Sequence, residues 1–204
     1  MANVVLDISM SLDGFVTGPS PSLQNGLGLG GERLHEWAMG ARTAADAALL
    51  DETTAATGAV LMGRRTFDFV DGPNGWSDER GFGGERSQSS PPPTFVVTSS
   101  TPANVRLAGR YEFVTDGIDN ALHRAQDAAG GKDVVIMGGA NLARQYLDAG
   151  QVDQLRIHIA PVVLTAGTPL FALSAGPAII LKQTDVHATQ AATHVTYRVI
   201  KSRA

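Results

Sequence analysis

The chain has 204 residues, 43% hydrophobic and 18% charged, with a formal net charge of -4 and no cysteine. This composition is typical of a globular protein, and the length predicts one domain over residues 1–204 with a core of its own. The absence of cysteine excludes disulfides, thiolate nucleophiles and cysteine-ligated zinc, while the scattered Lys and Arg residues show no footprint for nucleic acid or an anionic membrane.

The first part of the chain predicts short buried strands separated by helices and a long loop. Residues 4–10 form a first strand, and residues 17–31 form a loop rich in glycine and proline. Two helices are predicted over residues 32–39 and 43–54, where Ala, Leu, Asp and Glu dominate. The apolar run 59–62 is a second buried strand.

The rest of the chain begins with residues 71–93, a glycine- and proline-rich loop whose length indicates a lid or a disordered segment. Buried strands, helices with apolar residues at helical spacing, and a terminal hairpin follow. The predicted strands cover residues 95–98, 111–114, 134–137, 155–160, 179–187 and 194–200, and the predicted helices cover residues 118–129 and 140–150.

This order of elements predicts an α/β fold. Strands alternate with helices as far as residue 160 and then pair without helices, which indicates a mainly parallel sheet with an antiparallel edge. The closing strands and residues 160–170 offer an apolar edge that needs covering, so we expect a homodimer. The N-terminus lacks the pattern of a signal peptide, and no stretch approaches the roughly 20 apolar residues that span a bilayer. We therefore expect a cytoplasmic protein with neither a nucleic-acid nor a membrane partner.

Gly138 and Gly139 join the strand 134–137 to a helix with apolar residues at Leu142, Tyr146 and Leu147. Glycine allows a ligand to approach the backbone closely, and the unpaired amides of the helix start attract an anion. The junction therefore predicts either a site for a phosphate-bearing cofactor or a tight turn without a ligand, because short glycine motifs are weak signals.

Several motifs occur along the chain in a recognisable order, each at the end of a predicted strand or in the segments that follow. They are Ser11-Leu12-Asp13-Gly14, Met62-Gly63-Arg64-Arg65-Thr66, Thr98-Ser99-Ser100, Gly138-Gly139, Val152-Asp153-Gln154-Leu155 and the segment 160–167. Together they resemble the dihydrofolate reductase fold, and more closely the reductase domain of the bifunctional riboflavin-biosynthesis enzyme. The resemblance covers nearly the whole chain. It implies a three-layer α/β fold with a mainly parallel central sheet and an antiparallel C-terminal edge hairpin.

The resemblance implies that NADPH lies across the carboxyl ends of the strands, where open α/β sheets generally bind ligands. Arg64 with Ser99 or Ser100 would hold the 2′-phosphate, which favours NADP over NAD. Alternatively, Arg64 and Arg65 are solvated charges at a helix start. The implied pyrophosphate contacts are Gly138, Gly139, Ala140, Asn141 and Leu142; further phosphate contacts are Gly63, Arg64, Arg65, Thr66, Thr98, Ser99 and Ser100; the nicotinamide contacts are Ser9, Met10, Ser11, Phe15 and Val16.

Reduction of a C=N or C=O bond by hydride also requires a proton. Asp13 is a candidate catalytic or substrate-orienting carboxylate, although Asp before Gly also serves turn chemistry by bonding its own backbone. True dihydrofolate reductases carry their acid on the first helix. No position in residues 32–39 aligns with it, and Glu32 and Glu36 are only candidates.

Trp37 and Trp76 are candidates for walls of a flat substrate, with ordinary packing as the alternative. His158 and His194 are expected to be exposed or hydrogen-bonded structural residues. Because the five histidines lack metal-binding spacing, we predict no metal site. We therefore expect an NADPH-dependent reductase that transfers hydride to a small heterocyclic substrate, such as a pyrimidine or pterin. The alternatives are an NADP(H)-binding module without turnover and a flavin-binding α/β protein.

Overall fold

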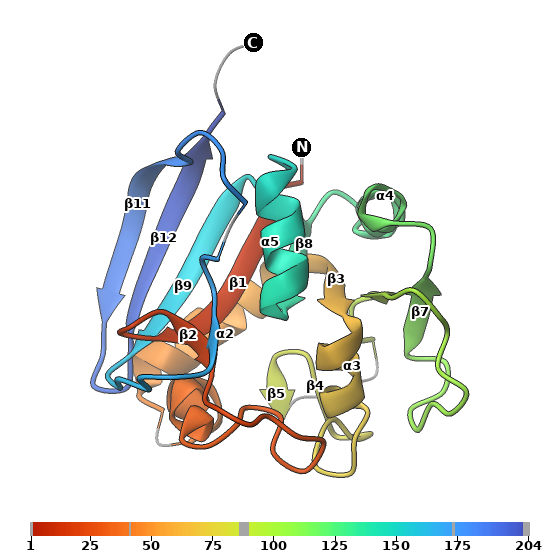
Figure 1. Cartoon of the computed structure of the whole chain (residues 1–204), viewed down its shortest axis with the longest axis horizontal. Helices are drawn as coiled ribbons and strands as arrows, with labels where there is room; N and C mark the ends of the chain where they lie inside the picture. The colour runs from red at the N-terminus through yellow and green to blue at the C-terminus, as the bar shows by residue number, and fades with distance from the viewer. Residues whose placement is uncertain (1, 41, 86–89, 173, 202–204) are drawn as a thin grey trace.

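The computed structural model describes residues 2–40, 42–85, 90–172 and 174–201 (Figure 1). Strands and helices alternate through most of the chain. The elements, in chain order, are β1 (Val4–Ser11), β2 (Phe15–Thr17), the 3-10 helix η1 (Gly31–His35), α1 (Glu36–Met39), α2 (Ala44–Ala56), β3 (Thr57–Gly63), α3 (Arg64–Val70), β4 (Arg80–Gly81), β5 (Gly84–Glu85), β6 (Thr94–Val97), β7 (Tyr111–Val114), α4 (Ile118–Ala128), β8 (Asp133–Gly138), α5 (Ala140–Asp148), β9 (Gln154–Ala160), β10 (Thr168–Pro169), β11 (Ile180–Ala188) and β12 (Thr193–Ile200).

Eight strands form the central sheet in the order β11-β12-β9-β1-β8-β3-β6-β7. The six strands from β9 to β7 pair in parallel, whereas β12 is antiparallel to both β9 and β11. This confirms the predicted α/β fold with a mainly parallel sheet and an antiparallel C-terminal edge hairpin. Parallel strands end at the same edge of a sheet, so the strand-to-helix junctions after β1, β3 and β8 are brought together there.

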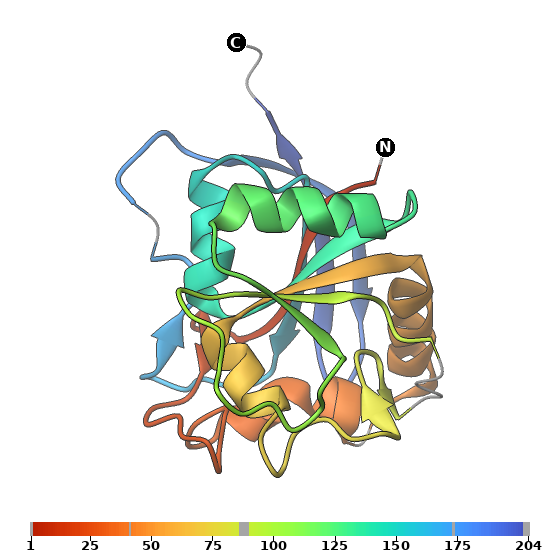
Figure 2. The ribbon, with the colours of Figure 1, turned by 90° about the vertical axis from the view of Figure 1, so that its right-hand side faces the viewer.

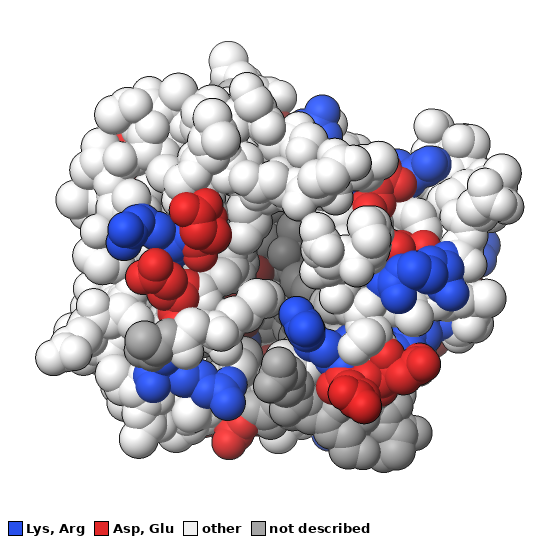
Figure 3. Space-filling model, turned by 90° about the horizontal axis from the view of Figure 1, so that it is seen from below, with Lys and Arg blue, Asp and Glu red and all other residues white. Residues whose placement is uncertain are grey.

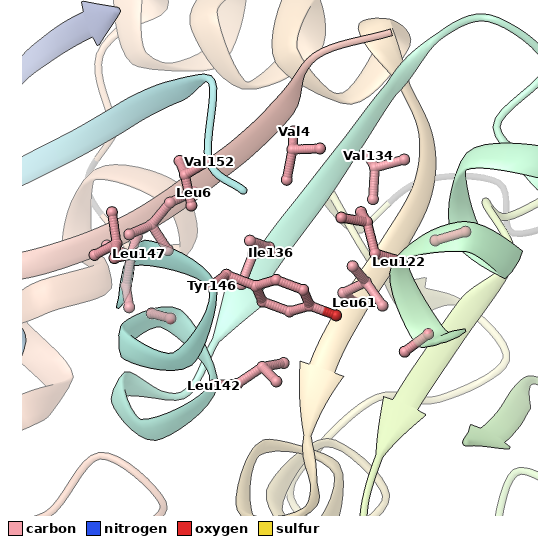
Figure 4. Close-up of a cluster of buried hydrophobic side chains, with 14 of the residues drawn as sticks. Val4, Leu6, Leu61, Leu122, Val134, Ile136, Leu142, Tyr146, Leu147 and Val152 are labelled. Carbon is pink, nitrogen blue, oxygen red and sulfur yellow. The ribbon is translucent and has the colours of Figure 1, made fainter. Parts of the chain in front are cut away.

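Helices α4 and α5 cover one face of the sheet and form the main core with it (Figures 1 and 4). Helix α5 belongs there because its apolar residues recur at helical spacing and are buried. Tyr146 lies at the centre of this cluster, fully buried beside Leu61 and Ile136. Its hydroxyl donates a hydrogen bond of 2.9 Å to the carbonyl of Ile118, which satisfies the one polar atom that this side chain brings into the core.

Two groups of helices cover the opposite face of the sheet. Around β3 and β6, Phe67 of α3 packs on Val60, Met62 and Val96 in a second apolar cluster. Around β1, β9 and β12, the cover consists of η1, α1 and α2, with α2 on the far side of the sheet from α5 (Figure 2). Thr43 begins α2 through a capping box with Asp46.

The long loop over residues 71–93 is anchored at its start. The Asp71 carboxylate accepts hydrogen bonds from the amides of Arg106 and Leu107, and the Arg106 guanidinium donates to the carbonyls of Asp71, Gly72 and Trp76. The loop also contains the two-residue strands β4 and β5. Residues 86–89 of the predicted lid or disordered segment lie outside the described residues.

One short strand near the N-terminus was not predicted. Phe15 and Val16, between the predicted first strand and the predicted loop, belong to strand β2, which pairs with β10. This strand pairs with residues about 150 positions away, so its neighbours in sequence give no sign of it. At the other end of the chain, all nine residues of β11 are exposed. Within the described residues, no helix is both long and apolar enough to cross a membrane.

Candidate functional site

Two glycine-containing junctions pack against each other at the carboxyl edge of the sheet. Gly63 begins α3 after β3, and Gly139 begins α5 after β8. A Cβ atom added to Gly63 would lie 3.8 Å from the Gly139 amide nitrogen. Cβ atoms added to Gly138 and Gly139 would lie 3.6 and 3.3 Å from the Thr66 hydroxyl oxygen. A side chain at Gly139 would therefore press on Thr66, and glycine at these positions lets the two helix starts approach each other closely.

The start of α5 is suited to an anion. Gly139, its N-cap residue, has no side chain to cap the helix, and no side chain of the described residues takes that place, so the first-turn amides are available. Ala140 and Leu142 are buried in the core and contribute only backbone to this surface. The exposed Asn141 accepts a hydrogen bond of 2.9 Å from Gln145 through its side-chain oxygen.

The end of β6 is the third strand end near these junctions. Arg64 bridges α3 to it, because its Nη1 donates to the carbonyl oxygen of Ser100 at 3.3 Å. Its Nε donates to the Asp68 carboxylate at 2.8 Å. Thr98 accepts a hydrogen bond from the Ser100 amide and donates to the Ser100 carbonyl, which holds this turn, while Ser99 is exposed. Two guanidinium nitrogens of Arg64, Nε and Nη1, thus already make structural hydrogen bonds.

A cleft of about 660 Å³ opens beside α3. Figure 3 shows the face at which the parallel strands end, and this face is hollowed in its middle. Arg65 lines the cleft from α3, opposite the loop that follows β2. The remaining lining residues are Gly18, Pro19, Ser20, Pro21, Ser22, Leu23, Asp68, Phe69, Gly167 and Thr168.

Asp13 anchors the turn after β1. Its carboxylate accepts hydrogen bonds from the Ser11 hydroxyl at 2.6 Å and from the amides of Leu164 and Thr165 at 3.1 and 2.7 Å. These bonds, that of Ser11 above all, hold the pKa of the Asp13 carboxyl below its usual value. Of the two roles considered for Asp13, this geometry favours the turn anchor, which also ties two distant loops together.

The residues expected around a nicotinamide divide between the two faces of the sheet. Ser9 and Ser11 are buried and hydrogen-bonded: Ser9 accepts from the Trp37 indole nitrogen at 2.9 Å, and Ser11 accepts from the Phe15 amide at 2.9 Å. Met10 and Val16 belong to the main core on the other face.

Both tryptophan side chains pack against other aromatic rings. Trp37 is only 5% exposed and lies against the rings of His158 and His194, with centroid distances of 4.1 and 4.9 Å. Trp76 stacks on Tyr111 at 6.2 Å in the second apolar cluster. The two side chains belong to separate clusters, and these contacts favour the packing role for each of them.

A buried polar network between β1, β9, β12 and α2 was not foreseen. The sequence predicted that His158 and His194 are either exposed or hydrogen-bonded. They are hydrogen-bonded to each other and are not exposed, with 1% and 4% of their surfaces accessible. The strands alternate as predicted; however, the polar face of these strands is covered by helices. Asp7 and Asp46 bind the outer nitrogens of the two rings. In the sequence, the alternation of Leu6, Ile8 and Met10 with polar residues is the pattern that could have indicated a polar face on β1.

The other candidate acids lie on the surface. Glu32 and Glu36 are exposed, and Glu36 lies 3.7 Å from Arg33. Among the residues that the structure describes, no three His, Asp or Glu side chains are grouped so as to hold a metal ion.

Comparison with known proteins identifies the family. The family model described as the RibD C-terminal domain matches residues 2–197. The chain belongs to this family. This confirms the resemblance to the reductase domain of the riboflavin-biosynthesis enzyme. A curated relative, the uncharacterized protein YyaP of Bacillus subtilis (strain 168), is 39% identical over 59 residues, which are 29% of this chain and 31% of that protein.

Solved structures share the fold of this RibD C-terminal domain. A putative riboflavin biosynthesis protein from Shewanella sp. PV-4 superimposes with a TM-score of 0.68 at 20% identity, covering 98% of this chain and 100% of that one. RibD from Acinetobacter baumannii gives a TM-score of 0.64 at 17% identity, covering 98% of this chain and 59% of that one. The diaminohydroxyphosphoribosylaminopyrimidine deaminase/5-amino-6-(5-phosphoribosylamino)uracil reductase from Thermotoga maritima gives 0.62 at 16%, with 98% and 57% covered. The chain thus spans a little over half of these two proteins.

Proposed function

We propose that this protein is an NADPH-dependent reductase that transfers hydride to a C=N or C=O bond of a small heterocyclic substrate, such as a pyrimidine or pterin. The observation that carries the proposal is the pairing of two glycine junctions, Gly63 and Gly138–Gly139, at the carboxyl edge of a RibD-like fold. Membership of the RibD C-terminal domain family supports a reductase. The name of the Thermotoga protein includes a 5-amino-6-(5-phosphoribosylamino)uracil reductase, which suggests a substituted pyrimidine as the class of substrate.

The residues present fit a phosphorylated dinucleotide. The space beside Thr66 would be crowded by a Cβ atom on Gly139, and the first-turn amides of α5 lack a side-chain cap. A diphosphate group needs both close backbone approach and amide donors. Arg65 adds a cation at the cleft, and Arg64 lies next to Ser100 at the end of β6, where a 2′-phosphate would bind. NADPH, when bound, supplies the hydride.

The chain's own residues would position the reactants and exclude water. Asp13 would act through the turn after β1, which the proposal places beside the reaction and which its three hydrogen bonds hold in position. It holds the turn after β1 against the segment that contains Leu164 and Thr165. A carboxylate with a depressed pKa is ionised at neutral pH, so Asp13 keeps these hydrogen bonds and is a poor proton donor.

The proposal is tested by adding NADPH to the purified protein while the fluorescence of the reduced nicotinamide is followed. We expect saturable binding, tighter than that of NADH. Oxidation of the bound cofactor is then assayed with dihydrofolate, a ribosylamino-pyrimidine and simple carbonyl compounds. Absence of binding at millimolar NADPH would overturn the proposal. Binding without oxidation by any of these compounds would favour the second candidate, an NADP(H)-binding module without turnover. A yellow purified protein would indicate a flavin.

We also propose that the protein forms a homodimer through β11. This edge strand presents nine exposed residues, including Ile180 at 58%, Leu181 at 38% and Val186 at 45%. An edge with unpaired backbone groups and apolar side chains is a template for another strand, and the same strand of a second copy satisfies it by two-fold symmetry. Sedimentation velocity should show a dimer that Val186→Lys converts to a monomer; a wild-type monomer would contradict this.

A further inference from the structure

The buried polar network is a row of hydrogen bonds that crosses the sheet under its helical cover. Asp7 on β1 lies 2.9 Å from His158 Nε2 on β9. His158 Nδ1 lies 2.7 Å from His194 Nδ1 on β12. His194 Nε2 lies 2.9 Å from Asp46 on α2. The network thus begins and ends on a carboxylate and has two imidazole rings in the middle.

Both carboxylates are ionised. Asp7 also accepts a 2.7 Å hydrogen bond from Arg156, and Asp46 accepts 2.7 Å bonds from the amide and the hydroxyl of Thr43. Burial raises the pKa of each carboxyl, but these bonds together with those from the histidines outweigh it, and both pKa values lie below the ordinary value. Each outer ring nitrogen must therefore carry a proton to donate to its carboxylate.

The two inner nitrogens, only 2.7 Å apart, hold one proton between them. Two bare lone pairs would repel at this distance, and two N–H groups would clash. The two rings therefore carry three protons on four nitrogens, which gives the pair one positive charge. With Arg156, this charge balances Asp7 and Asp46, so the network is neutral as a whole.

Within the part of the chain that the structure describes, no further carboxylate lies against the pair to balance a second charge. Burial lowers the pKa of His194, although the hydrogen bond that its ring donates to Asp46 raises it, and the charge on His158 lowers it further. The other ionisable groups that face the pair are also histidines: His35 on η1, and His187, which pairs with His194 across β11 and β12. Uptake of a second proton would place two N–H groups against each other at the centre of the network.

Helices α1 and α2, which cover this face of the sheet, both contact this pair of histidine rings. Trp37 of α1 lies against both of them and donates its indole N–H to Ser9. Asp46 is also the residue that completes the capping box of α2. We propose that His158 and His194 share a single positive charge, and that a second proton, taken up in mildly acidic solution, parts the two rings and releases α2 and Trp37 from the sheet. This device goes beyond the proposed function and operates without a bound cofactor.

The test follows Trp37 in a Trp76→Phe background, which leaves it as the one tryptophan of the chain. We expect its emission to rise and shift to the red between pH 7 and about 5, because exposure to water replaces contact with a charged imidazole. His194→Gln keeps an amide donor for Asp46 but removes the second protonation site, and it should abolish the transition. His187→Gln changes an exposed histidine opposite on β11 and should leave the transition unchanged.

Three outcomes would overturn the proposal: no change in Trp37 emission over this pH range, a transition that persists in His194→Gln, or one that disappears in His35→Gln instead. If His194→Gln fails to fold, NMR of the wild-type protein with ¹⁵N-labelled histidine decides at pH 7.5. Three protonated nitrogens on the two buried rings would support the shared charge. Two would overturn it.

Discussion

The Thr66 hydroxyl oxygen lies 3.3 Å from the position that a Cβ atom on Gly139 would take. Glycine thus lets the start of α5 lie close to α3 and keeps its backbone bare for the proposed cofactor. We expect Gly139→Val to lower NADPH affinity at least tenfold, roughly 1.4 kcal/mol, because its methyl groups cover this backbone. The backbone of Gly139 is extended, which valine adopts readily, and a small shift of the Thr66 side chain relieves the contact with the added Cβ atom, so the fold should persist. Fluorescence titration measures the affinity.

The matched control is Gly176→Val. The nearest atom to its added Cβ is the carbonyl oxygen of Ser174 at 3.9 Å, and Gly176 is exposed. This variant should bind NADPH as the wild type does. Equal affinities for Gly139→Val and Gly176→Val would show that the phosphates of the cofactor bind elsewhere.

Arg64 should determine the preference for NADPH over NADH. We expect Arg64→Ala to reduce the ratio of the two affinities about tenfold, because a guanidinium beside Ser100 matches a phosphate. Asp68→Asn removes the acidic partner of Arg64 but keeps the positive charge, so it should preserve the ratio. Arg33→Ala controls for net charge at an exposed site. A ratio that falls equally in Asp68→Asn and Arg64→Ala would indicate a structural role for the pair.

Asp13→Asn distinguishes the two roles considered for this carboxylate. The amide keeps one oxygen for the bonds from Ser11, Leu164 and Thr165, so the turn should loosen and the midpoint of thermal unfolding should fall. If Asp13 only anchors the turn, kcat should change little once the protein is saturated with both substrates. A loss of kcat of a hundredfold or more, with the midpoint unchanged, would instead assign it to the reaction.

Because His35 is buried, we expect the protein to lose stability in acid. The buried Nδ1 of His35 has no hydrogen-bond partner among the described residues, and burial together with the nearby His158 lowers its pKa to about 4 from an ordinary 6.5. Between these values the unfolded chain binds the proton and the folded chain does not, so stability falls as pH falls through this range, by up to about 3 kcal/mol. Urea unfolding at pH 7, 6 and 5 measures the slope. His35→Phe should reduce the slope, and an unchanged slope would contradict this assignment.

Local patterns were sufficient to predict the sheet. The β-branched run that ends at Met137 and the glycines after it mark a buried strand and its exit, and the hairpin near the C-terminus follows from alternation. The proximity of Gly63 to Gly139 also follows, because parallel strands end at one edge. In each case the signal lies within a few residues of the feature that it predicts.

Pairings between distant residues could not be predicted in this way. Asp13 binds the amides of Leu164 and Thr165, and β2 pairs with β10, across about 150 positions. The polar side of β9 gives the same pattern whether it faces water or another polar layer. His158 was therefore expected to be either exposed or hydrogen-bonded, and only the position of α2 decides between these environments.

The bond between Asp46 and His194 spans 148 residues of the sequence. During synthesis, α2 emerges from the ribosome long before the histidine that binds its Asp46 carboxylate. This tie between α2 and the sheet can form only when the last strand has been inserted. A ribosome stalled before residue 190 would therefore carry a chain whose early helix is formed but not yet held in place.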